Sequence, residues 1–345
     1  MRFGILGSGS WATAIAKILT DSHHSLNWWI RNEAVIQHLE KHRHNPQYLS
    51  SVYFDTGKLK LSPKLGQVIA DSGCIIVAMP SAYIEKIFGE LPPDTFEGKQ
   101  VLSAVKGILP GKDLLLNEYL KNQFGFGTDQ YFTLMGPCHA EEIASEKLSY
   151  LTFSGLSETS TAELASHFTT DYLNTITNTD IYGVQYASVL KNIYALGAGM
   201  AHGLEYGDNF LSVFIANCAD EMAGFLHKAG ILHIEVGIHE NSKPESVKKS
   251  ANYAASVYLG DLLVTCYSLF SRNRTFGNMI GKGYSVQAAK LELNMVAEGY
   301  YGSSCIYRIN RQMKADMPVA ETVYKILWEN LPVREGFKRM ENLLV

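Results

Sequence analysis

The sequence predicts an α/β fold in its N-terminal half, built on a doubly wound parallel sheet, and an all-helical C-terminal half. Three observations lead to this prediction. Short apolar runs alternate with amphipathic segments up to about residue 180, which is typical of strands and helices in a parallel sheet. A glycine-rich turn joins the first such run to the first amphipathic segment. Beyond this half the apolar residues follow long helical patterns instead.

The elements of the first half follow one another in regular order. The continuous apolar run 74–79, which Pro80 closes, is typical of a strand buried on both faces of a sheet. The predicted strands are 3–6, 26–30, 58–61, 74–79, 101–105 and 132–135, and the predicted helices are 11–20, 33–42, 81–91 and 112–122.

The second half contains only helical patterns. The predicted helices are 186–202, 209–228, 246–257, 285–298 and 319–329. The change of period near residue 180 predicts two domains, 1–180 and 181–345, which agrees with the usual domain size for a chain of 345 residues.

Composition narrows the functional class. The chain has a net charge of −4, so it does not show the excess of basic residues that is typical of a dedicated nucleic-acid binder. The five cysteines are odd in number and far apart, without a C-x-x-C pair, so neither a disulfide framework nor a zinc site is indicated. This pattern fits a reducing compartment. Neither a signal peptide nor an uncharged apolar run of about 18 residues is recognisable, so we expect a cytoplasmic protein without a membrane span.

A glycine-rich turn follows the first predicted strand. Its sequence, Gly7-Ser8-Gly9-Ser10-Trp11-Ala12, has the G-x-G-x-x-A form and opens the first predicted helix, which is the context that a dinucleotide-binding loop requires. Gly7 allows a tight turn, Gly9 lets the backbone approach a diphosphate, and Ala12 lets the helix pack closely on the strand. The helix N-terminus offers N–H groups to the phosphates. We therefore expect dinucleotide binding here rather than a plain glycine turn.

The end of the second predicted strand bears on the choice of dinucleotide. NAD-binding folds place an acidic residue about 20 positions after the glycine loop, where it binds the ribose 2′-hydroxyl. Here the strand ends in Trp29-Ile30-Arg31-Asn32, without an acid. Arg31 can accept a 2′-phosphate and stack on adenine, which favours NADP, or dual use of NADP and NAD, over strict NAD. The alternative is a solvated surface arginine.

Lys106 and Lys191 are candidate functional cations. Lys106 directly follows the strand 101–105, and ligands bind at the carboxyl ends of strands in such sheets. Lys191 interrupts the otherwise apolar helical segment 184–200. A lysine in that setting either extends to water or is held for a purpose such as general-base catalysis. The helical pattern alone favours extension to water.

The run 259–277 gathers hydroxyls, two arginines and an amide. Arginine suits multi-point recognition of phosphate. The alternative is a polar helix start with Ser271 as its cap, and the run by itself does not separate the two.

Together these stretches resemble the NAD(P)-dependent glycerol-3-phosphate dehydrogenases over nearly the whole chain, from Gly7 to about Tyr324. The run Ser271-Arg272-Asn273-Arg274 after Gly260-Asp261-Leu262 is the most specific of them. The others are Gly7 to Trp11, Trp29 to Arg31, Val105 to Gly107, Gly136-Pro137, Leu190 to Asn192, Gly207 to Asn209, Thr265-Cys266 and Glu298-Gly299.

The resemblance implies an N-terminal Rossmann-type NAD(P)-binding domain and an all-α substrate-binding domain, with the site between them. It implies interconversion of dihydroxyacetone phosphate and sn-glycerol 3-phosphate, which supplies glycerophospholipid synthesis. We also expect a homodimer without a nucleic-acid partner, and no metal, because no His/Cys/carboxylate cluster has ligand spacing. Lys191 matches the proton acceptor, Lys106 a cation that contacts both cofactor and substrate, and Asp261 a further catalytic residue. The matching cofactor contacts are Gly7, Gly9, Ser10, Trp11, Arg31, Lys106, Ala140, Arg272 and Glu298. The matching substrate contacts are Lys106, Gly136, Cys138, Lys191, Asp261, Ser271, Arg272 and Asn273. Of these, Arg272 and Asn273 match residues on the phosphate side.

Three departures from the family pattern stand out. Ala12 replaces a glycine, which is a mild change. Cys138 replaces a serine, so a thiol, which is a weaker donor, stands where a hydroxyl would contact substrate. Val257-Tyr258 replace small residues and are expected to reshape the pocket wall.

Other functional classes remain open at this point. The β-hydroxyacid dehydrogenases share the two-domain plan, but their lysine is followed by asparagine four residues on, where this chain has Ala195. Sugar-nucleotide dehydrogenases use a cysteine nucleophile, for which Cys138 or Cys266 would be needed; buried inert thiols are commoner. A non-catalytic dinucleotide sensor would need neither Lys191 nor the Arg272 run.

Overall fold

The computed structural model describes residues 1–231, 254–293 and 296–344. For residues 254–256 it describes the backbone alone. The chain is divided into two compact units. The first consists of Met1–Leu109 and Leu114–Ile181, and the second of Pro110–Asp113 and the residues from Tyr182 onward. Each unit is described below by itself.

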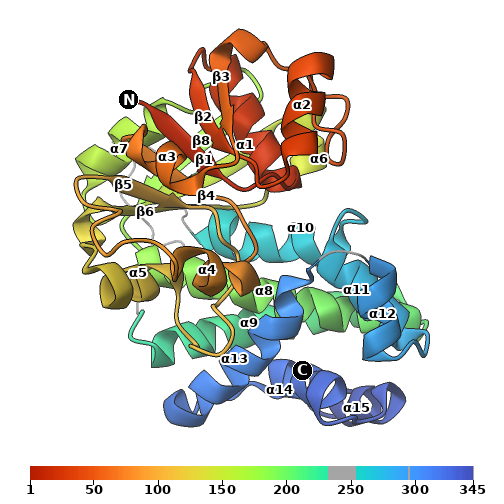
Figure 1. The fold of residues 1–345 in the computed structure, drawn as a ribbon. Helices are drawn as coiled ribbons and strands as arrows, with labels where there is room; N and C mark the ends of the chain where they lie inside the picture. The colour runs from red at the N-terminus through yellow and green to blue at the C-terminus, as the bar shows by residue number, and fades with distance from the viewer. Residues whose placement is uncertain (232–253, 294–295, 345) are drawn as a thin grey trace, which may run out of the picture. The chain divides into compact units, whose positions relative to one another are not determined.

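A single eight-stranded sheet forms the centre of the first unit (Figure 1), in the order β3-β2-β1-β4-β5-β6-β7-β8. The strands β1 to β6 run parallel, whereas β7 is antiparallel to β6 and parallel to β8. The sheet is therefore doubly wound about β1, as predicted. The strand bounds are β1 Phe3–Leu6, β2 Leu26–Trp29, β3 Leu59–Ser62, β4 Cys74–Val77, β5 Gln100–Ser103, β6 Tyr131–Met135, β7 Ser149–Ser154 and β8 Leu173–Asn178.

Both faces of this sheet are covered by apolar side chains. Along β4, Cys74 and Ile76 belong to one buried cluster, and Ile75 and Val77 to another. Successive side chains of a strand point to opposite faces, so the two clusters lie on opposite sides of the sheet. The helices that accompany the sheet are α1 Ser10–Asp21, α2 Glu33–His42, α3 Leu65–Ala70, α4 Ser81–Phe88, α5 Leu116–Phe124, α6 Ala140–Ala144 and α7 Glu158–Ser166, with short 3₁₀ turns η1 Thr56–Lys58 and η2 Thr128–Gln130.

The prediction of a helix over 112–122 is wrong at its start. Helix α5 begins only at Leu116, where the Glu118 carboxylate accepts a hydrogen bond from the Leu115 N–H at 2.8 Å. Asp113 has a left-handed φ of 56° and forms an ion pair with Arg308 of the second unit's α13. The segment Pro110–Asp113 therefore belongs to the second unit. Strands β7 and β8 and the short helices α3, α6 and α7 were not predicted.

The described residues of the second unit form helices joined by loops, without a strand. Its elements are α8 Ile181–Gly203, α9 Asp208–Lys228, the π-helix η3 Ala254–Gly260, α10 Asp261–Tyr267, α11 Arg272–Gly281, α12 Val286–Leu293, α13 Glu298–Met313, α14 Pro318–Trp328 and α15 Val333–Met340. The predicted helix 285–298 is wrong as a single element, because α12 ends at Leu293 and α13 begins at Glu298. Most of the predicted helix 246–257 lies outside the described residues. Within the described ranges, none of the helices has both the length and the apolar character that a membrane crossing requires.

Glycines allow α8 and α11 to pack unusually closely. A Cβ atom at Gly199 of α8 would lie 2.1 Å from the Arg274 carbonyl oxygen, and one at Gly277 of α11 would lie 2.0 Å from the Leu196 carbonyl oxygen. Only residues without a side chain fit such a crossing. This contact brings the first turn of α11, which carries Arg272 and Asn273, against the helix that carries Lys191.

Candidate active site

The glycine turn has the geometry of a dinucleotide-binding loop. Gly7 has φ +125°, and a Cβ atom there would lie 2.5 Å from the Ala78 carbonyl oxygen of the neighbouring strand end. Gly9 is the N-cap of α1, and a Cβ atom there would meet no atom within 4 Å. The backbone at Gly9 thus faces open space at a helix N-terminus, which suits a bound phosphate. Ala12, where the family pattern has glycine, is fully buried in the core.

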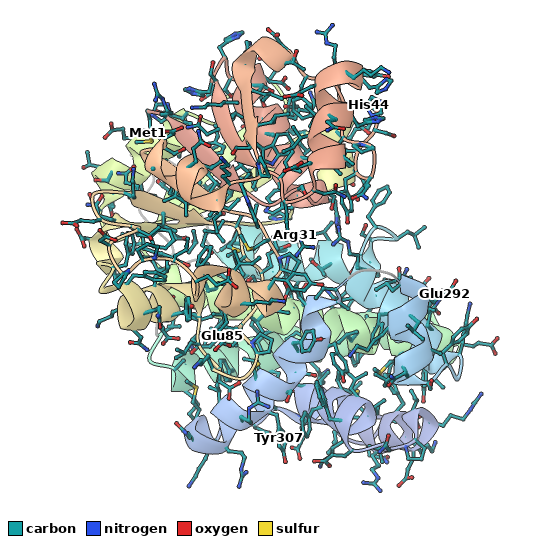
Figure 2. All side chains as sticks on the ribbon, in the orientation of Figure 1. Met1, Arg31, His44, Glu85, Glu292 and Tyr307 are labelled. Atoms are coloured by element: carbon teal, nitrogen blue, oxygen red, sulfur yellow. The ribbon has the colours of Figure 1, made fainter. Side chains whose placement is uncertain are left out.

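The end of β2 presents Arg31 at the surface. Trp29 and Ile30 are buried, whereas Arg31 is exposed. Asn32 caps α2 by accepting a hydrogen bond from the Ala34 N–H at 3.0 Å. In Figure 2 the Arg31 side chain lies apart from His44, which follows the other end of α2. The exposed guanidinium is therefore available to a ligand that approaches the end of this strand.

Lys106 contacts the glycine loop through an aromatic ring. It follows β5 and is half-buried. Its Nζ lies 5.1 Å from the centre of the Trp11 ring, within the range of a cation–π interaction. The first unit therefore brings together a predicted catalytic residue and a predicted cofactor contact that are far apart in its sequence.

The segment from Gly136 to Ala140 joins β6 to α6. Gly136 has φ +121°, and a Cβ atom there would lie 2.8 Å from the Tyr150 carbonyl oxygen of β7, so only glycine fits. Cys138 is buried and Ala140 is the first residue of α6. Both belong to the core cluster that also holds Ala12 of α1, and α6 packs against α1, the helix that the glycine turn opens.

In the second unit, Lys191 of α8 and Asp261 of α10 form a buried ion pair. The two side chains are only 4% and 2% exposed. The interpretation of Lys191 as a lysine that extends to water is therefore wrong: a carboxylate compensates its charge inside the helical unit. The second carboxylate oxygen of Asp261, Oδ2, is buried without a hydrogen-bond partner among the described residues, so it can accept one from a ligand.

A π-helical turn delivers Asp261 to Lys191. The π-helix η3, Ala254–Gly260, runs directly into α10, whose first residue is Asp261. π-helical turns are frequent at functional sites. Thr265 donates a hydrogen bond to the Asp261 carbonyl oxygen at 2.5 Å and lies 3.5 Å from its Oδ1. Val257 and Tyr258 of the π-helix are buried.

The first turn of α11 carries the predicted phosphate-binding residues. The Ser271 hydroxyl caps the helix by accepting a hydrogen bond from the Arg274 N–H at 3.3 Å, as the simpler interpretation predicted. Arg272 is half-buried at the first helical position. The helix N-terminus and the guanidinium together favour an anion here.

Asn273 connects this turn to two other helices. Its Nδ2 donates to the Asn192 Oδ1 of α8 at 2.9 Å, and its Oδ1 accepts from the Gly299 N–H of α13 at 3.0 Å. Glu298, the predicted cofactor contact, is the first residue of α13. Asn273 therefore holds Asn192, the neighbour of Lys191, and the start of α13 in place. These bonds leave one Nδ2 hydrogen for a ligand, and sequence reasoning did not foresee this bridging role.

Two other fully buried side chains of the first unit contact the glycine turn and were also not predicted. Trp28 Nε1 donates to the Gly7 carbonyl oxygen at 2.7 Å, and Asn45 Nδ2 donates to the Ser8 carbonyl oxygen at 3.1 Å. The only signal in the sequence was their place, on the second strand and just after the second predicted helix. All five cysteines are buried and none forms a disulfide. Burial raises the pKa of Cys266 to about 12, which makes it a poor nucleophile.

Both halves of the chain match models of known protein families. Residues 2–161 match the N-terminal domain, and residues 180–338 the C-terminal domain, of NAD-dependent glycerol-3-phosphate dehydrogenase. A glycerol-3-phosphate dehydrogenase [NAD(P)+] of Pelodictyon phaeoclathratiforme is 32% identical over 97% of this chain and 96% of its own length. One of Carboxydothermus hydrogenoformans is 31% identical over 97% of this chain and 95% of its own.

Solved structures resemble the fold. A glycerol-3-phosphate dehydrogenase of Coxiella burnetii superposes with a TM-score of 0.86 at 23% identity, covering 98% of both chains. A ketopantoate reductase of Ralstonia eutropha reaches only 0.59 at 14% identity, covering 97% of this chain and 99% of its own. The two-domain architecture is thus shared by more than one class of dehydrogenase, and fold alone does not choose between them.

Proposed function

Because the chain belongs to the NAD(P)-dependent glycerol-3-phosphate dehydrogenase family, we propose that it interconverts dihydroxyacetone phosphate and sn-glycerol 3-phosphate with NAD or NADP as the hydride carrier. The observation that carries the proposal is the buried pair of Lys191 and Asp261 on facing helices. A buried ammonium held by a carboxylate with one unoccupied oxygen is suited to proton transfer at a substrate hydroxyl.

The first unit has the features that a dinucleotide requires. The open space above Gly9, the start of α1 and the exposed Arg31 supply backbone donors for a diphosphate and a cation for the adenosine end. Residues 1–180 would hold the cofactor through Gly7, Gly9, Ser10, Trp11, Arg31, Lys106 and Ala140, and residues 181–345 would bind substrate, with Arg272 and Glu298 also reaching the cofactor. The missing acid after β2 supports NADP, or both cofactors, over strict NAD. When bound, the cofactor supplies or accepts the hydride.

The mechanism follows from the residue types. In the reducing direction the Lys191 ammonium donates a proton from Nζ to the oxygen on C2 of the substrate, and in the oxidising direction neutral Lys191 takes that proton back. Asp261 holds Lys191 Nζ in place and offers its Oδ2 to a substrate hydroxyl. Lys106 stabilises the negative charge that develops on the reacting oxygen.

The substrate phosphate is assigned to the start of α11. Arg272 provides a forked cation, Asn273 its remaining amide hydrogen, and the helix N-terminus further donors. Ser271 contributes chiefly by capping this helix. Gly136 and Cys138 would line the substrate's path in the first unit, with Cys138 as a weak donor.

The cellular setting follows from the reaction. Glycerol 3-phosphate made by this enzyme would supply glycerophospholipid synthesis. We assign the enzyme to the cytoplasm because its five buried cysteines, none of which forms a disulfide, suit a reducing compartment. We expect a homodimer.

One assay separates this proposal from its alternatives. We expect the protein to oxidise NADPH or NADH with dihydroxyacetone phosphate and to leave a β-keto acid unreduced. The residue four positions after Lys191 is Ala195, fully buried in α8, so the asparagine of a β-hydroxyacid dehydrogenase is absent from that position. Turnover with the β-keto acid alone would favour that class, and binding of dinucleotide without turnover of either substrate would indicate a sensor.

A further inference from the structure

The three carbonyl groups of the turn Gly7-Ser8-Gly9 each accept a hydrogen bond from a side chain. The Gly7 oxygen accepts from Trp28 Nε1 at 2.7 Å and the Ser8 oxygen from Asn45 Nδ2 at 3.1 Å. The Gly9 oxygen accepts from Thr13 Oγ1 at 3.0 Å. Trp28, Asn45 and Thr13 are all 0% exposed, so water does not compete for these bonds.

These bonds determine which way the peptide planes of the turn face. In a trans peptide the C=O and the following N–H point in opposite directions. A side chain that holds the carbonyl of one residue on the interior side therefore turns the N–H of the next residue away from it. By this argument Trp28 turns the Ser8 N–H, and Asn45 the Gly9 N–H, away from these buried donors. Thr13 Oγ1 adds a second bond to the Gly9 oxygen, which already accepts the helical hydrogen bond from the Thr13 N–H at 3.0 Å.

Asn45 is the centre of this arrangement. Besides the Ser8 oxygen, its Nδ2 donates to Thr13 Oγ1 at 3.0 Å, and its Oδ1 accepts from the N–H groups of Gln47 and Tyr48 at 3.0 and 3.2 Å. The side-chain amide thus uses both of its hydrogens and both acceptor positions. A rotated amide would set its oxygen against the Ser8 oxygen, so the network permits one orientation only. Asn45 links the segment after α2 rigidly to the glycine turn.

We propose that Asn45, with Thr13 and Trp28, is a positioning residue that pre-orients the backbone N–H groups of the glycine turn for the cofactor diphosphate. The proposal rests on the proposed function, since it concerns the same dinucleotide. These side chains act through the backbone. Their loss should therefore weaken binding of the diphosphate without changing the hydride and proton transfers that Lys191 and Lys106 serve.

The test measures dinucleotide affinity and turnover in three variants, each of which removes one of the three carbonyl contacts: Asn45→Ala, Thr13→Val and Trp28→Phe. The dissociation constants of NADH, NADPH and ADP-ribose are measured by calorimetry. We expect each variant to weaken all three ligands by about 10-fold, equivalent to about 1.4 kcal/mol. The KM for the dinucleotide should rise in parallel, while kcat stays within about 2-fold of the parent and the KM for dihydroxyacetone phosphate does not change. Thr13→Ser keeps the hydroxyl and should retain the parent affinity.

Asn27→Ala is the matched control. Asn27 is a buried asparagine of the same unit whose Nδ2 donates to the Asp71 carbonyl oxygen at 3.0 Å and to Ser72 Oγ at 2.8 Å, away from the glycine turn. This variant should unfold at lower temperature but bind NADH like the parent. If Asn45→Ala does not fold, Thr13→Val and Trp28→Phe decide the question.

Two negative results have different meanings. A parent protein that binds neither NADH nor NADPH contradicts the proposed function itself. A parent that binds them, with folded variants of equal affinity, overturns the positioning role of Asn45, Thr13 and Trp28 while leaving the proposed function intact.

Discussion

Lys191 and Asp261 form an ion pair that is almost completely enclosed by the helical unit. Removal of one partner from such a pair leaves an uncompensated buried charge, which costs several kcal/mol. A structural role and a catalytic role therefore both predict damage, and experiments must separate loss of folding from loss of proton transfer.

We expect Lys191→Ala to lower kcat by about 10²- to 10⁴-fold, because general acid–base catalysis contributes on this order, while NADPH affinity stays near that of the parent. Stopped-flow hydride transfer and calorimetric NADPH binding measure the two quantities. Lys17→Met is the control, since Lys17 is also a buried lysine paired with carboxylates, those of Asp21 and Glu146. It should lose stability but retain turnover. Near-normal turnover in Lys191→Ala would rule out Lys191 as the group that transfers the proton.

Arg272→Lys tests the phosphate site. The variant keeps the charge but loses the fork of donors, so we expect the apparent affinity for dihydroxyacetone phosphate to fall by about 10- to 100-fold. The ratio of kcat/KM for dihydroxyacetone phosphate to that for dihydroxyacetone measures the phosphate contribution directly. If neither Arg272→Lys nor Arg272→Ala changes this ratio, the phosphate binds elsewhere.

Arg31→Ala tests the cofactor choice. We expect it to weaken NADPH more than NADH, because only NADPH carries the 2′-phosphate that an arginine would pair with. Steady-state KM values for both cofactors measure the effect, and Lys41→Ala, an exposed cation at the far end of α2, should change neither. Equal losses for both cofactors would indicate adenine stacking instead.

Glu221 predicts a stability that depends on pH. Its carboxylate accepts hydrogen bonds from the N–H groups of Val319 and Ala320 at the start of α14, yet burial raises its pKa to about 8 from an ordinary 4.5. The unfolded chain releases this proton at a lower pH than the folded one does. The stabilising contribution is therefore complete below pH 4.5 and is lost as pH rises toward about 8.

The comparison with Glu221→Gln isolates this effect, because glutamine does not titrate. We expect the free energy of unfolding of the parent, relative to the variant, to fall between pH 5 and pH 8 in urea denaturation. If the difference in unfolding free energy between the parent and Glu221→Gln stays constant or rises with pH, the raised pKa of Glu221 is contradicted. Glu329→Gln, at an exposed position, serves as the control for a surface carboxylate.

Much of the parallel sheet could be predicted because several of its strands, such as Phe3–Leu6 and Cys74–Val77, are short buried apolar runs. The strand Phe3–Leu6 and the helix Glu33–His42 have the predicted bounds. Strands β7 and β8 were missed because polar residues interrupt them, as the serines and the threonine do in Ser149–Ser154, so neither strand is a continuous apolar run. The helix predicted over 285–298 was wrong because apolar periodicity does not show where a chain turns between two helices.

The sequence by itself determined the doubly wound sheet, the glycine turn and the family, since each depends on residues that are neighbours in the chain. Only the tertiary structure decided the state of the polar side chains, because the partners lie far apart in sequence. Lys191 has the same neighbours on its helix whether it extends to water or pairs with Asp261, and it is the packing of α10 on the other helices that removes the water. In the same way Asn45 resembles any loop asparagine until the fold places its amide against the Ser8 carbonyl, where an unpaired polar group would be costly.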